Sequence, residues 1–411
     1  MNKIIVLMLM LCCAQLSFIQ PSMAHGHAEQ NADGYLAISV AFDAAGKLWR
    51  VQVKDGFVVL SHSADQGKTF SKPVNVNAEA QKISAHGEVR PKIAFGKNNE
   101  IYVTWVQNLK PRFAGYVWFA RSIDGGNTFQ AQIVHQDRAE IGHGFEEISV
   151  ARNGDVTVLW LDARDLVEAK KAGVKRSGSS IYYAVSRDAG KTFTVEQKLA
   201  DYSCECCRIA ITTKPDGTGL NSTTVAMWRH VFEGNERDHM MAEIPKAGVK
   251  PELHRATFSN WKIDGCPHHG AALASGGGGA EPNQKNSVWW GYHMAYFDGS
   301  DNKTGLYYSR MDGVAWVSSP AKKFGDNSKQ AGHPAILSVA ENVWLVWREI
   351  KDGKSSILGK FSSDGGKNWD DAKILLESTD KTDYPQLLLN KNTPILVWNT
   401  AKTGLQVLPL N

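Results

Sequence analysis

Several features are scarce in this sequence, and each scarcity excludes a class of protein. Proline accounts for 14 of the 411 residues and the 37 glycines follow no fixed period, which excludes a collagen-like or low-complexity chain. The net charge is only +4 and no basic tract is present, so nucleic acid is not an expected partner. Beyond the first residues no apolar run is long enough to span a membrane. The hydrophobic content of 43% instead indicates a globular chain with a sizeable core.

The N-terminal segment has the pattern of an export signal. Lys3 precedes an apolar run from Ile4 to Ile19, and Ala24 ends a small-residue cleavage pattern. We therefore expect residues 1–24 to be removed and residues 25–411 to form one exported domain, periplasmic or secreted. Because that compartment oxidises thiols, disulfides must be weighed for the four cysteines that remain, which are Cys204, Cys206, Cys207 and Cys266.

A tryptophan-ended strand pattern recurs along the whole chain. The spacing is roughly 50 to 70 residues, and alternating apolar strands flank each copy. Units too small to bury their own faces, repeated without helical periods, predict an all-β propeller of four-stranded antiparallel blades, with seven blades favoured over six. The last unit has room for only three strands, so residues 33–36 are expected to supply its fourth. The seven copies are LWR 48–50, VTW 103–105, VLW 158–160, AMW 226–228, VWW 288–290, LVW 345–347 and LVW 396–398.

Four units carry a second, more specific motif. They read SADQGKTF at 63–70, SIDGGNTF at 122–129, SRDAGKTF at 186–193 and SSDGGKNW at 362–369. Asp and Gly suit a tight hairpin, and the terminal aromatic side chain packs between sheets. These motifs resemble the Asp-box, or bacterial neuraminidase repeat, of sialidase-like propellers. The resemblance implies the fold over nearly the whole mature chain, but the box lies away from the catalytic face in that family and implies no activity.

Residues just before the innermost strand of each blade are expected to meet on one face of a propeller. Overlaying the units places there Arg90, Glu146 or Glu147, Cys207, His269, His333 and Tyr384. Two neighbouring units match further, because CECCR at 204–208 and CPHHG at 266–270 are 62 residues apart, one blade repeat. Chains with this pair of motifs resemble a bacterial subgroup of the sialidase-like family.

Thiolates and imidazoles gathered at one place are ligands for a soft or borderline metal. The main functional prediction is therefore an exported propeller whose central face binds copper or zinc, or a small ligand, with redox chemistry as an option. The alternatives left open by the sequence are disulfides alone, such as Cys204–Cys266, and mixtures of the two. The candidate metal ligands are Cys204, Cys206, Cys207, Cys266, His268, His269 and His333.

The sialidase-like resemblance implies a different function, hydrolysis of acidic sugars. In that family three arginines clamp the sugar carboxylate and a tyrosine nucleophile pairs with a glutamate. The Arg-Ile-Pro motif that opens sialidase domains is absent here, and only Arg90-Pro91 remains of it. A third reading is a protein-interaction scaffold. The candidate catalytic residues are Arg90, Glu146, Arg208, Arg229, Arg348 and Tyr384.

Overall fold

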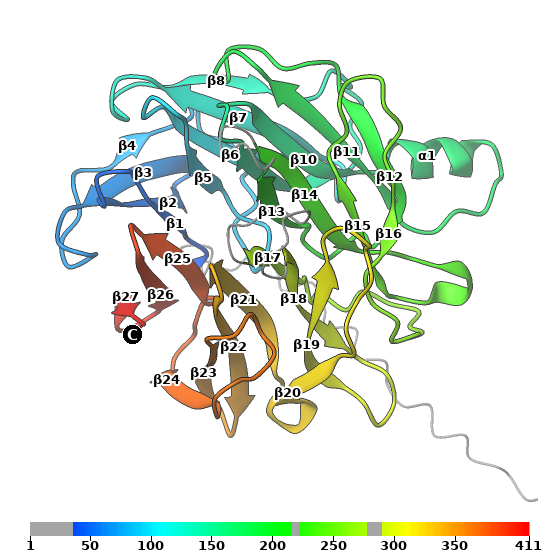
Figure 1. Ribbon diagram of the computed structural model, residues 1–411. Coiled ribbons are helices and arrows are strands. Elements are labelled where there is room, and N and C mark those ends of the chain that lie inside the picture. Colours follow the sequence, from blue (N-terminus) through cyan, green and yellow to red (C-terminus); the bar gives the residue numbers. More distant parts are fainter. Residues whose placement is uncertain (1–35, 216–221, 278–289, 411) are drawn as a thin grey trace, which may run out of the picture.

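The computed structural model describes residues 36–215, 222–277 and 290–410. They form seven antiparallel sheets arranged as a ring around a central axis, and the chain runs around that ring from β1 to β27 (Figure 1). The prediction of a seven-bladed propeller is thus confirmed. The expected leader, residues 1–24, and residues 33–35 of the expected closing strand lie outside the described residues.

Within each blade the strands follow one another in chain order from the axis outward. Blade 1 comprises β1 (Ser39–Phe42), β2 (Leu48–Lys54), β3 (Phe57–Ser63) and β4 (Val74–Asn75). Blade 2 comprises β5 (Lys92–Phe95), β6 (Ile101–Asn108), β7 (Gly115–Ser122) and β8 (Gln130–Ile133). Blade 3 comprises β9 (His143–Val150), β10 (Val156–Asp162), β11 (Ser179–Ser186) and β12 (Gln197–Ser203). Blade 4 comprises β13 (Ala210–Pro215), β14 (Ser222–Arg229), β15 (His239–Glu243) and β16 (His254–Arg255).

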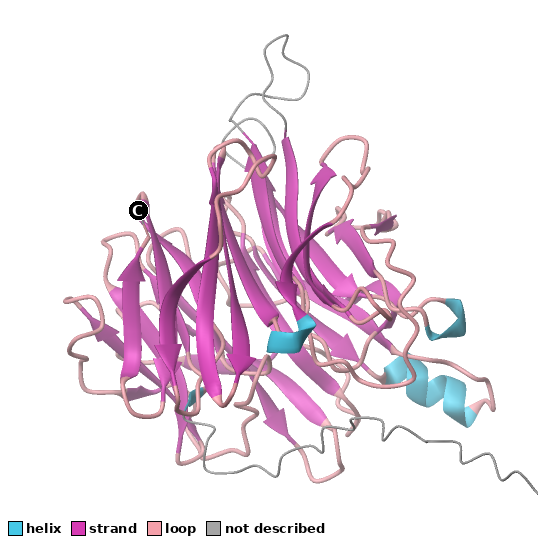
Figure 2. Cartoon of the chain, turned by 90° about the horizontal axis from the view of Figure 1, so that it is seen from below, coloured by secondary structure: helices cyan, strands magenta, loops and turns pink. Residues whose placement is uncertain are grey.

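The remaining blades complete the ring. Blade 5 comprises β17 (Ala272–Gly277), β18 (Trp290–Asp298), β19 (Gly305–Asp312) and β20 (Lys322–Asp326). Blade 6 comprises β21 (Gly332–Val339), β22 (Asn342–Lys351), β23 (Lys354–Ser362) and β24 (Lys373–Ser378). Blade 7 comprises β25 (Gln386–Asn390), β26 (Thr393–Thr400) and β27 (Gly404–Pro409). Figure 2 shows the same stack of sheets from the side.

The core lies between neighbouring blades, where the faces of their sheets meet. Five fully buried tryptophans sit toward the C-terminal ends of the second strands of their blades. Burying such side chains removes the largest apolar surfaces of the chain from water and fixes how neighbouring sheets pack. These residues are Trp105, Trp160, Trp228, Trp347 and Trp398.

The other two tryptophans of the predicted repeat are not equivalent to these five. Trp49 is the second residue of β2 and Trp290 is the first residue of β18, so both lie at the opposite end of their strands. In blade 5 the equivalent residue is Tyr296. It directly follows Ala295, which pairs with Ala272 at the start of β17, just as Trp228 follows Met227, which pairs with Ala210 at the start of β13. The prediction was wrong here because a triplet motif records residue type but not the register of the strand.

The four sequences that resemble the Asp-box form hairpin turns with a shared set of hydrogen bonds. In the first, the Ser63 hydroxyl donates to Asp65 Oδ1 at 2.7 Å and accepts from the Gly67 amide at 2.7 Å. Asp65 in turn accepts from the amide and the hydroxyl of Thr69 at 2.9 and 2.6 Å. Gly126 of the second turn has φ +84°, and a Cβ there would lie 3.0 Å from Leu60, so glycine is needed for the close approach between blades.

One expected feature of the loops differs in the structure. The sequence predicts no helix of note and a polar surface insertion over 167–177, yet α1 (Arg164–Lys171) forms there and overlaps the first residues of that insertion. Lys170 and Lys171 lie in its last turn, where positive charge offsets the helix dipole. The second expected insertion, 276–287, lies mostly outside the described residues. Among the helices of the described residues, none is long and apolar enough to cross a membrane.

The ring closes where blade 7 meets blade 1, and side chains make most of that closure. The Gln386 side chain donates to the Ile38 carbonyl at 3.0 Å and accepts from the Val40 amide at 3.3 Å. Asn399 donates to the Leu36 carbonyl at 3.1 Å. In Figure 1 the red β25 accordingly lies beside the blue β1.

Candidate functional site

Glu88, in the segment before β5, is the centre of a polar cluster at one end of the ring axis. Its carboxylate accepts from the Gly270 amide at 2.9 Å and lies 3.3 Å from His333 Nδ1. It also accepts from the Arg208 amide at 3.4 Å, and Arg208 Nε lies 4.0 Å away. Blades 2, 4, 5 and 6 therefore meet at one carboxylate, which is only 9% exposed.

Blade 7 joins this cluster through Tyr384, which precedes β25. Its ring stacks on His333 with centroids 3.6 Å apart and planes 8° from parallel. The guanidinium of Arg348 lies 4.7 Å from the Tyr384 ring centroid. His269 lies 5.0 Å from His333, ring to ring. We call Glu88, Arg208, His269, His333, Arg348 and Tyr384 the central cluster.

The backbone of β21 is shaped to bring His333 into this cluster. Gly332 pairs with Arg348 and Ala335 with Val346, so His333 and Pro334 together face one residue of β22. This is a β-bulge, and His333 has φ 51°. Bulges of this kind redirect a side chain out of the regular alternation of a strand.

The electrostatics of the cluster leave one anion among several cations. Burial opposes ionisation of Glu88, but the hydrogen bond from His333 and the charge of Arg208 outweigh it, so the pKa of Glu88 lies below its ordinary value. Burial lowers the pKa of His333 to about 4, although Glu88 acts in the opposite direction. Burial raises the pKa of Tyr384, and the charge of Arg348 acts against that rise. Burial also lowers the pKa of His269, so at neutral pH the cluster holds one carboxylate, two neutral imidazoles, a protonated phenol and two guanidinium cations.

Two of the arginines in the predicted clamp are occupied by the protein itself. Arg90 forms an ion pair with Asp383 at 2.5 Å and donates to the Ile38 carbonyl at 2.9 Å. Arg229 is 2% exposed and donates to the carbonyls of His269 and Phe297 at 3.1 and 2.9 Å. Both therefore hold the blades in place and are not free to clamp a sugar carboxylate.

The other two arginines are better placed to meet one. Arg208 and Arg348 are partly exposed. Arg348 Nε has no hydrogen-bond partner among the described residues. Arg208 binds the carbonyls of Ala271 and Pro334 at 3.0 and 2.8 Å, which spans blades 5 and 6 and fixes its guanidinium near the axis.

Glu146 of β9 lies apart from the contacts that define the central cluster. It sits in a second β-bulge, where Phe145 has φ 53° and the pairing skips between Glu147 and Gly144. Its side chain is buried, and neither carboxyl oxygen has a hydrogen-bond partner among the described residues. Burial raises the pKa of Glu146 to about 8, with Lys92 acting against that rise. Lys92 is itself paired with Glu147 at 2.6 Å.

The predicted cysteine and histidine residues form a second cluster beside the first. The ligand atoms of Cys204, Cys206 and Cys207 lie within 4.8 Å of one another, and so do those of Cys206, Cys266 and His268. Cys206 belongs to both triads, and its Sγ lies 3.6 Å from that of Cys204. We call these five residues the cysteine cluster.

All four described cysteines are free thiols in this structure. The disulfide considered for Cys204 and Cys266 is therefore not formed, and it is Cys206 that approaches Cys266. Hydrogen bonds from Cys206 and Cys207 lower the pKa of Cys204, and the hydrogen bond to Cys204 raises the pKa of Cys206. Hydrogen bonding within the cluster thus favours the thiolate forms of Cys204 and Cys266 and opposes that of Cys206.

The two clusters are joined through the same two loops. Cys207 is followed directly by Arg208, and His268 is followed by His269 and Gly270. The loops that carry the thiols therefore also carry the amides that hold Glu88. His269 and His333, expected as metal ligands, belong to the central cluster, whereas His268 belongs to the cysteine cluster.

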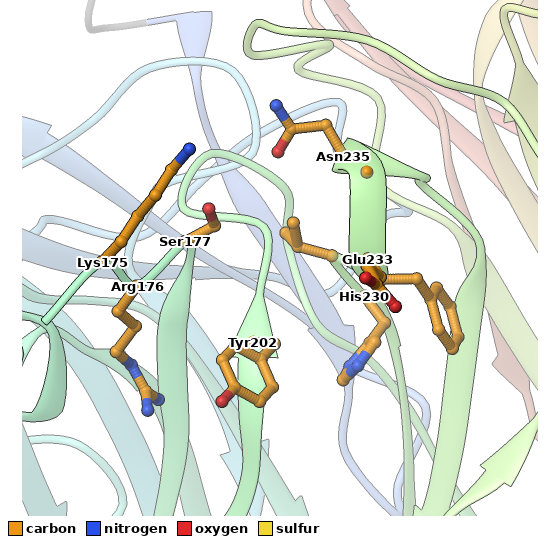
Figure 3. A pocket seen from close by; sticks show the side chains of 10 residues that line it. Lys175, Arg176, Ser177, Tyr202, His230, Glu233 and Asn235 are labelled. Carbon is orange, nitrogen blue, oxygen red and sulfur yellow. The ribbon is translucent and has the colours of Figure 1, made fainter.

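A pocket of about 530 Å³ opens on the outer side of the cysteine cluster. Arg176 lies 4.8 Å from the ring of Tyr202, and the His230 ring packs edge-on against Phe232 at 4.5 Å (Figure 3). Val231 lines the pocket and also packs against the cysteines. No sequence pattern indicated this pocket, because its lining combines loops from blades 3 and 4.

A third group of possible ligands is already satisfied within the protein. Asp137, His143 and Asp162 lie within 4.8 Å of one another. Arg164 occupies this group, since its Nη2 lies 2.7 Å and its Nε 3.0 Å from Asp162. This network stabilises the loop before α1.

Sequence reasoning missed Glu88 and Asp383. Glu88 stands two residues before Arg90, and Asp383 immediately precedes Tyr384, so both adjoin residues that the overlay selected. The available signal was an acidic residue close to a residue predicted to lie at the axis. A charge that is buried at the axis needs a partner of opposite charge.

Neither a protein-family model nor a curated protein matches the sequence. Among solved structures, an ulvan lyase of polysaccharide lyase family PL25 has a TM-score of 0.55 at 13% identity, over 90% of this chain and 91% of that chain. The same lyase bound to -[GlcA(1-4)Rha3S]- has a TM-score of 0.55 at 13% identity, over 92% and 95% of the two chains. A Hadza microbial sialidase has a TM-score of 0.49 at 14% identity, over 87% and 74%. The likeness to the lyase is one of fold.

Proposed function

We propose that this chain is an enzyme that cleaves acidic glycans and that the central cluster is its active site. The observation that carries the proposal is the stack of His333 on Tyr384, held by Glu88 and flanked by Arg348. An ulvan lyase of the same fold has been solved with an oligosaccharide that contains GlcA, which supports a uronate as the substrate class.

The arginines provide the recognition of a sugar carboxylate. Arg208 and Arg348 are partly exposed beside a buried anion, and the Nε atom of Arg348, which is itself buried, has no hydrogen-bond partner among the described residues. Guanidinium groups bind carboxylates through charge-assisted hydrogen bonds. Neutralising the carboxylate also acidifies the proton on the adjacent sugar carbon, which prepares it for removal by a base.

His333 and Tyr384 provide the proton transfers. Glu88 accepts the Nδ1 proton of His333, which leaves Nε2 as the basic nitrogen of a neutral imidazole. Nε2 removes the carbon-bound proton next to the carboxylate, and the electron pair forms a carbon–carbon double bond as the glycosidic oxygen leaves. The Tyr384 hydroxyl gives its proton to that oxygen. Glu88 acts through His333 and is a positioning residue.

Hydrolysis is the alternative, as the sialidase-like resemblance implies. It requires Tyr384 as nucleophile, Glu88 as its base, and a separate acid for the leaving group. Glu146, selected from the sequence for the glutamate role, has no hydrogen bond in the part of the chain that the structure describes that would link it to Tyr384. The cluster therefore fits elimination better than hydrolysis.

The test is to incubate the protein with uronate-containing polysaccharides and with neutral ones of similar length. Elimination produces an unsaturated sugar with a new ultraviolet absorbance, whereas hydrolysis produces reducing ends without it. We expect Tyr384→Phe and His333→Gln each to reduce turnover by at least 100-fold. Tyr307→Phe is the matched control, since its hydroxyl donates to the Lys303 carbonyl at the periphery. Reducing ends without absorbance would replace elimination by hydrolysis, and no cleavage of any acidic glycan would refute the proposal.

A second candidate function is the binding of a soft metal ion by the cysteine cluster. Its supporting observation is the pair of triads that share Cys206, with three of the four thiols buried. Thiolate and imidazole ligands select Cu(I) or Zn(II). Elemental analysis of protein isolated without added metal tests it, and copper or zinc near one or more equivalents, lost in Cys206→Ser, is the expected result. Equal metal in both proteins would refute it.

A further inference from the structure

The cysteine cluster has a feature that a single metal ion does not explain, namely that Cys206 belongs to two separate triads. We propose that the cluster binds two Cu(I) ions bridged by the Cys206 thiolate. Cys204 and Cys207 complete the ligand set of an inner ion, and Cys266 and His268 complete that of an outer ion. This inference rests on the proposed metal function and adds its metal, its stoichiometry and its ligand assignment.

The spacing of the ligand atoms argues for two ions. A tetrahedral ion with metal–sulfur bonds of about 2.3 Å needs four ligand atoms that are all about 3.8 Å apart. Within the described residues the ligand atoms form two groups of three, and no group of four lies within 4.8 Å. The 3.6 Å between the sulfurs of Cys204 and Cys206 suits two ligands of one ion. Two further ligands on each side of the shared sulfur give two three-coordinate sites.

Coordination number and charge both select Cu(I) over Zn(II). Structural zinc is almost always four-coordinate, whereas three soft donors suit the softer Cu(I). Two Cu(I) ions with four thiolates carry a net charge of about −2, which the two neighbouring guanidinium groups offset. Arg237 favours the thiolate of Cys204, and Arg229 favours that of Cys207. The Nε atoms of both arginines are buried and have no hydrogen-bond partner among the described residues.

The inner and the outer metal site differ in their access to solvent. Cys204 and Cys207 are 1% and 2% exposed and pack against Val231 and Phe145. Cys266 is exposed. The outer site is therefore the entry, and the inner site is dry and shielded, which protects thiolates from oxidation once the ion is bound.

The experiment is an anaerobic titration of the reduced full chain with Cu(I), in competition with a chromogenic Cu(I) chelator. Every sample carries Cys12→Ser and Cys13→Ser, and the variant with all four cluster cysteines changed to Ser gives the background. We expect two equivalents in the parent, one in Cys204→Ser, one in Cys266→Ser, and none bound tightly in Cys206→Ser. X-ray absorption of the loaded parent is expected to show a copper–copper scattering path. Circular dichroism of the metal-free variants verifies that each one folds.

The outcomes separate the inference from the function on which it rests. One equivalent in the parent, lost in both Cys204→Ser and Cys266→Ser, would overturn the two-ion site and leave a mononuclear metal protein. Copper no higher than in the four-serine variant would overturn both. Binding of one Zn(II) with higher affinity than copper would overturn the assignment of the metal.

Discussion

Replacing Glu146 with Gln tests whether burial controls the ionisation of this carboxyl. Glu146 is 1% exposed, and neither of its oxygens has a hydrogen-bond partner among the described residues. Gln has the same shape as the protonated acid but cannot ionise. The substitution therefore removes a titration and leaves the packing unchanged.

The size of the effect follows from the pKa of Glu146, which burial raises from 4.5 to about 8. Between these values the unfolded chain releases the proton and the folded chain keeps it, so the stability of the folded state falls as pH rises. Each pH unit between the two pKa values costs about 1.4 kcal/mol of folding stability. The loss therefore reaches about 5 kcal/mol at pH 8 and is constant above that pH. Below pH 4.5 both states hold the proton and the loss is absent. We thus expect the free energy of unfolding of Glu146→Gln to equal that of the parent at pH 4.5. At pH 8.5 it should exceed that of the parent by about 5 kcal/mol.

Urea unfolding of the parent and the variant at a series of pH values measures this difference. An unfolding entropy of about 2.1 cal/mol/K per residue converts 5 kcal/mol into a rise in Tm of about 6 °C at pH 8.5. Glu140→Gln, at an exposed position on the loop before the same strand, is the control and should follow the parent. Parallel curves for the parent and Glu146→Gln across this range would refute the reasoning, since they would mean that the carboxyl is solvated.

Three further predictions concern the central cluster and the core. The elimination rate should fall as pH drops through about 4, because His333 must be neutral to act as a base and burial lowers its pKa to about 4. A pH–rate profile in which the rate falls near pH 6.5 instead would contradict this. Gly270→Ala should abolish activity and lower the free energy of unfolding by about 1–3 kcal/mol, because the new Cβ would lie 2.6 Å from Glu88 Oε2. Activity assays and urea unfolding measure the two effects, and wild-type turnover would disprove the close approach. Trp398→Ala should cost about 3–5 kcal/mol in urea unfolding, because the side chain is fully buried in the blade that closes the ring, and a cost below 1 kcal/mol would show that it packs loosely.

The sequence allowed the blade count to be predicted because each blade repeats a local pattern. Period-2 strands and the Asp-box turns depend on neighbours within a few residues, so they can be read without knowing the fold. The pairing of the two cysteine motifs followed from the same periodicity, because a 62-residue offset places two segments on adjacent blades. The triad of Cys206, Cys266 and His268 lies across that blade boundary.

The central cluster could be predicted only in part, because its contacts join distant segments. Glu88 meets Gly270 and His333, which are 182 and 245 residues away in the chain. The overlay selects one position just before each inner strand, which in blade 2 is Arg90, but Glu88 lies two residues earlier and contacts blades 5 and 6. The same limit explains Arg90, which was expected to clamp a ligand and is instead paired with Asp383.

The junction of blades 1 and 7 also determines how a ligand would change the lifetime of the folded ring. No continuous backbone ladder joins β1 to β25 in the described residues; Gln386, Asn399 and the pair of Arg90 with Asp383 bridge the gap. Tyr384 is the next residue after Asp383, whose carboxylate accepts from the Ile38 amide next to blade 1 at 3.3 Å, so a glycan bound at the central cluster would steady the segment that joins the last blade to the first. Because such a ligand binds the folded ring and not the unfolded chain, bound protein should be more stable, unfold more slowly and resist proteases longer than free protein.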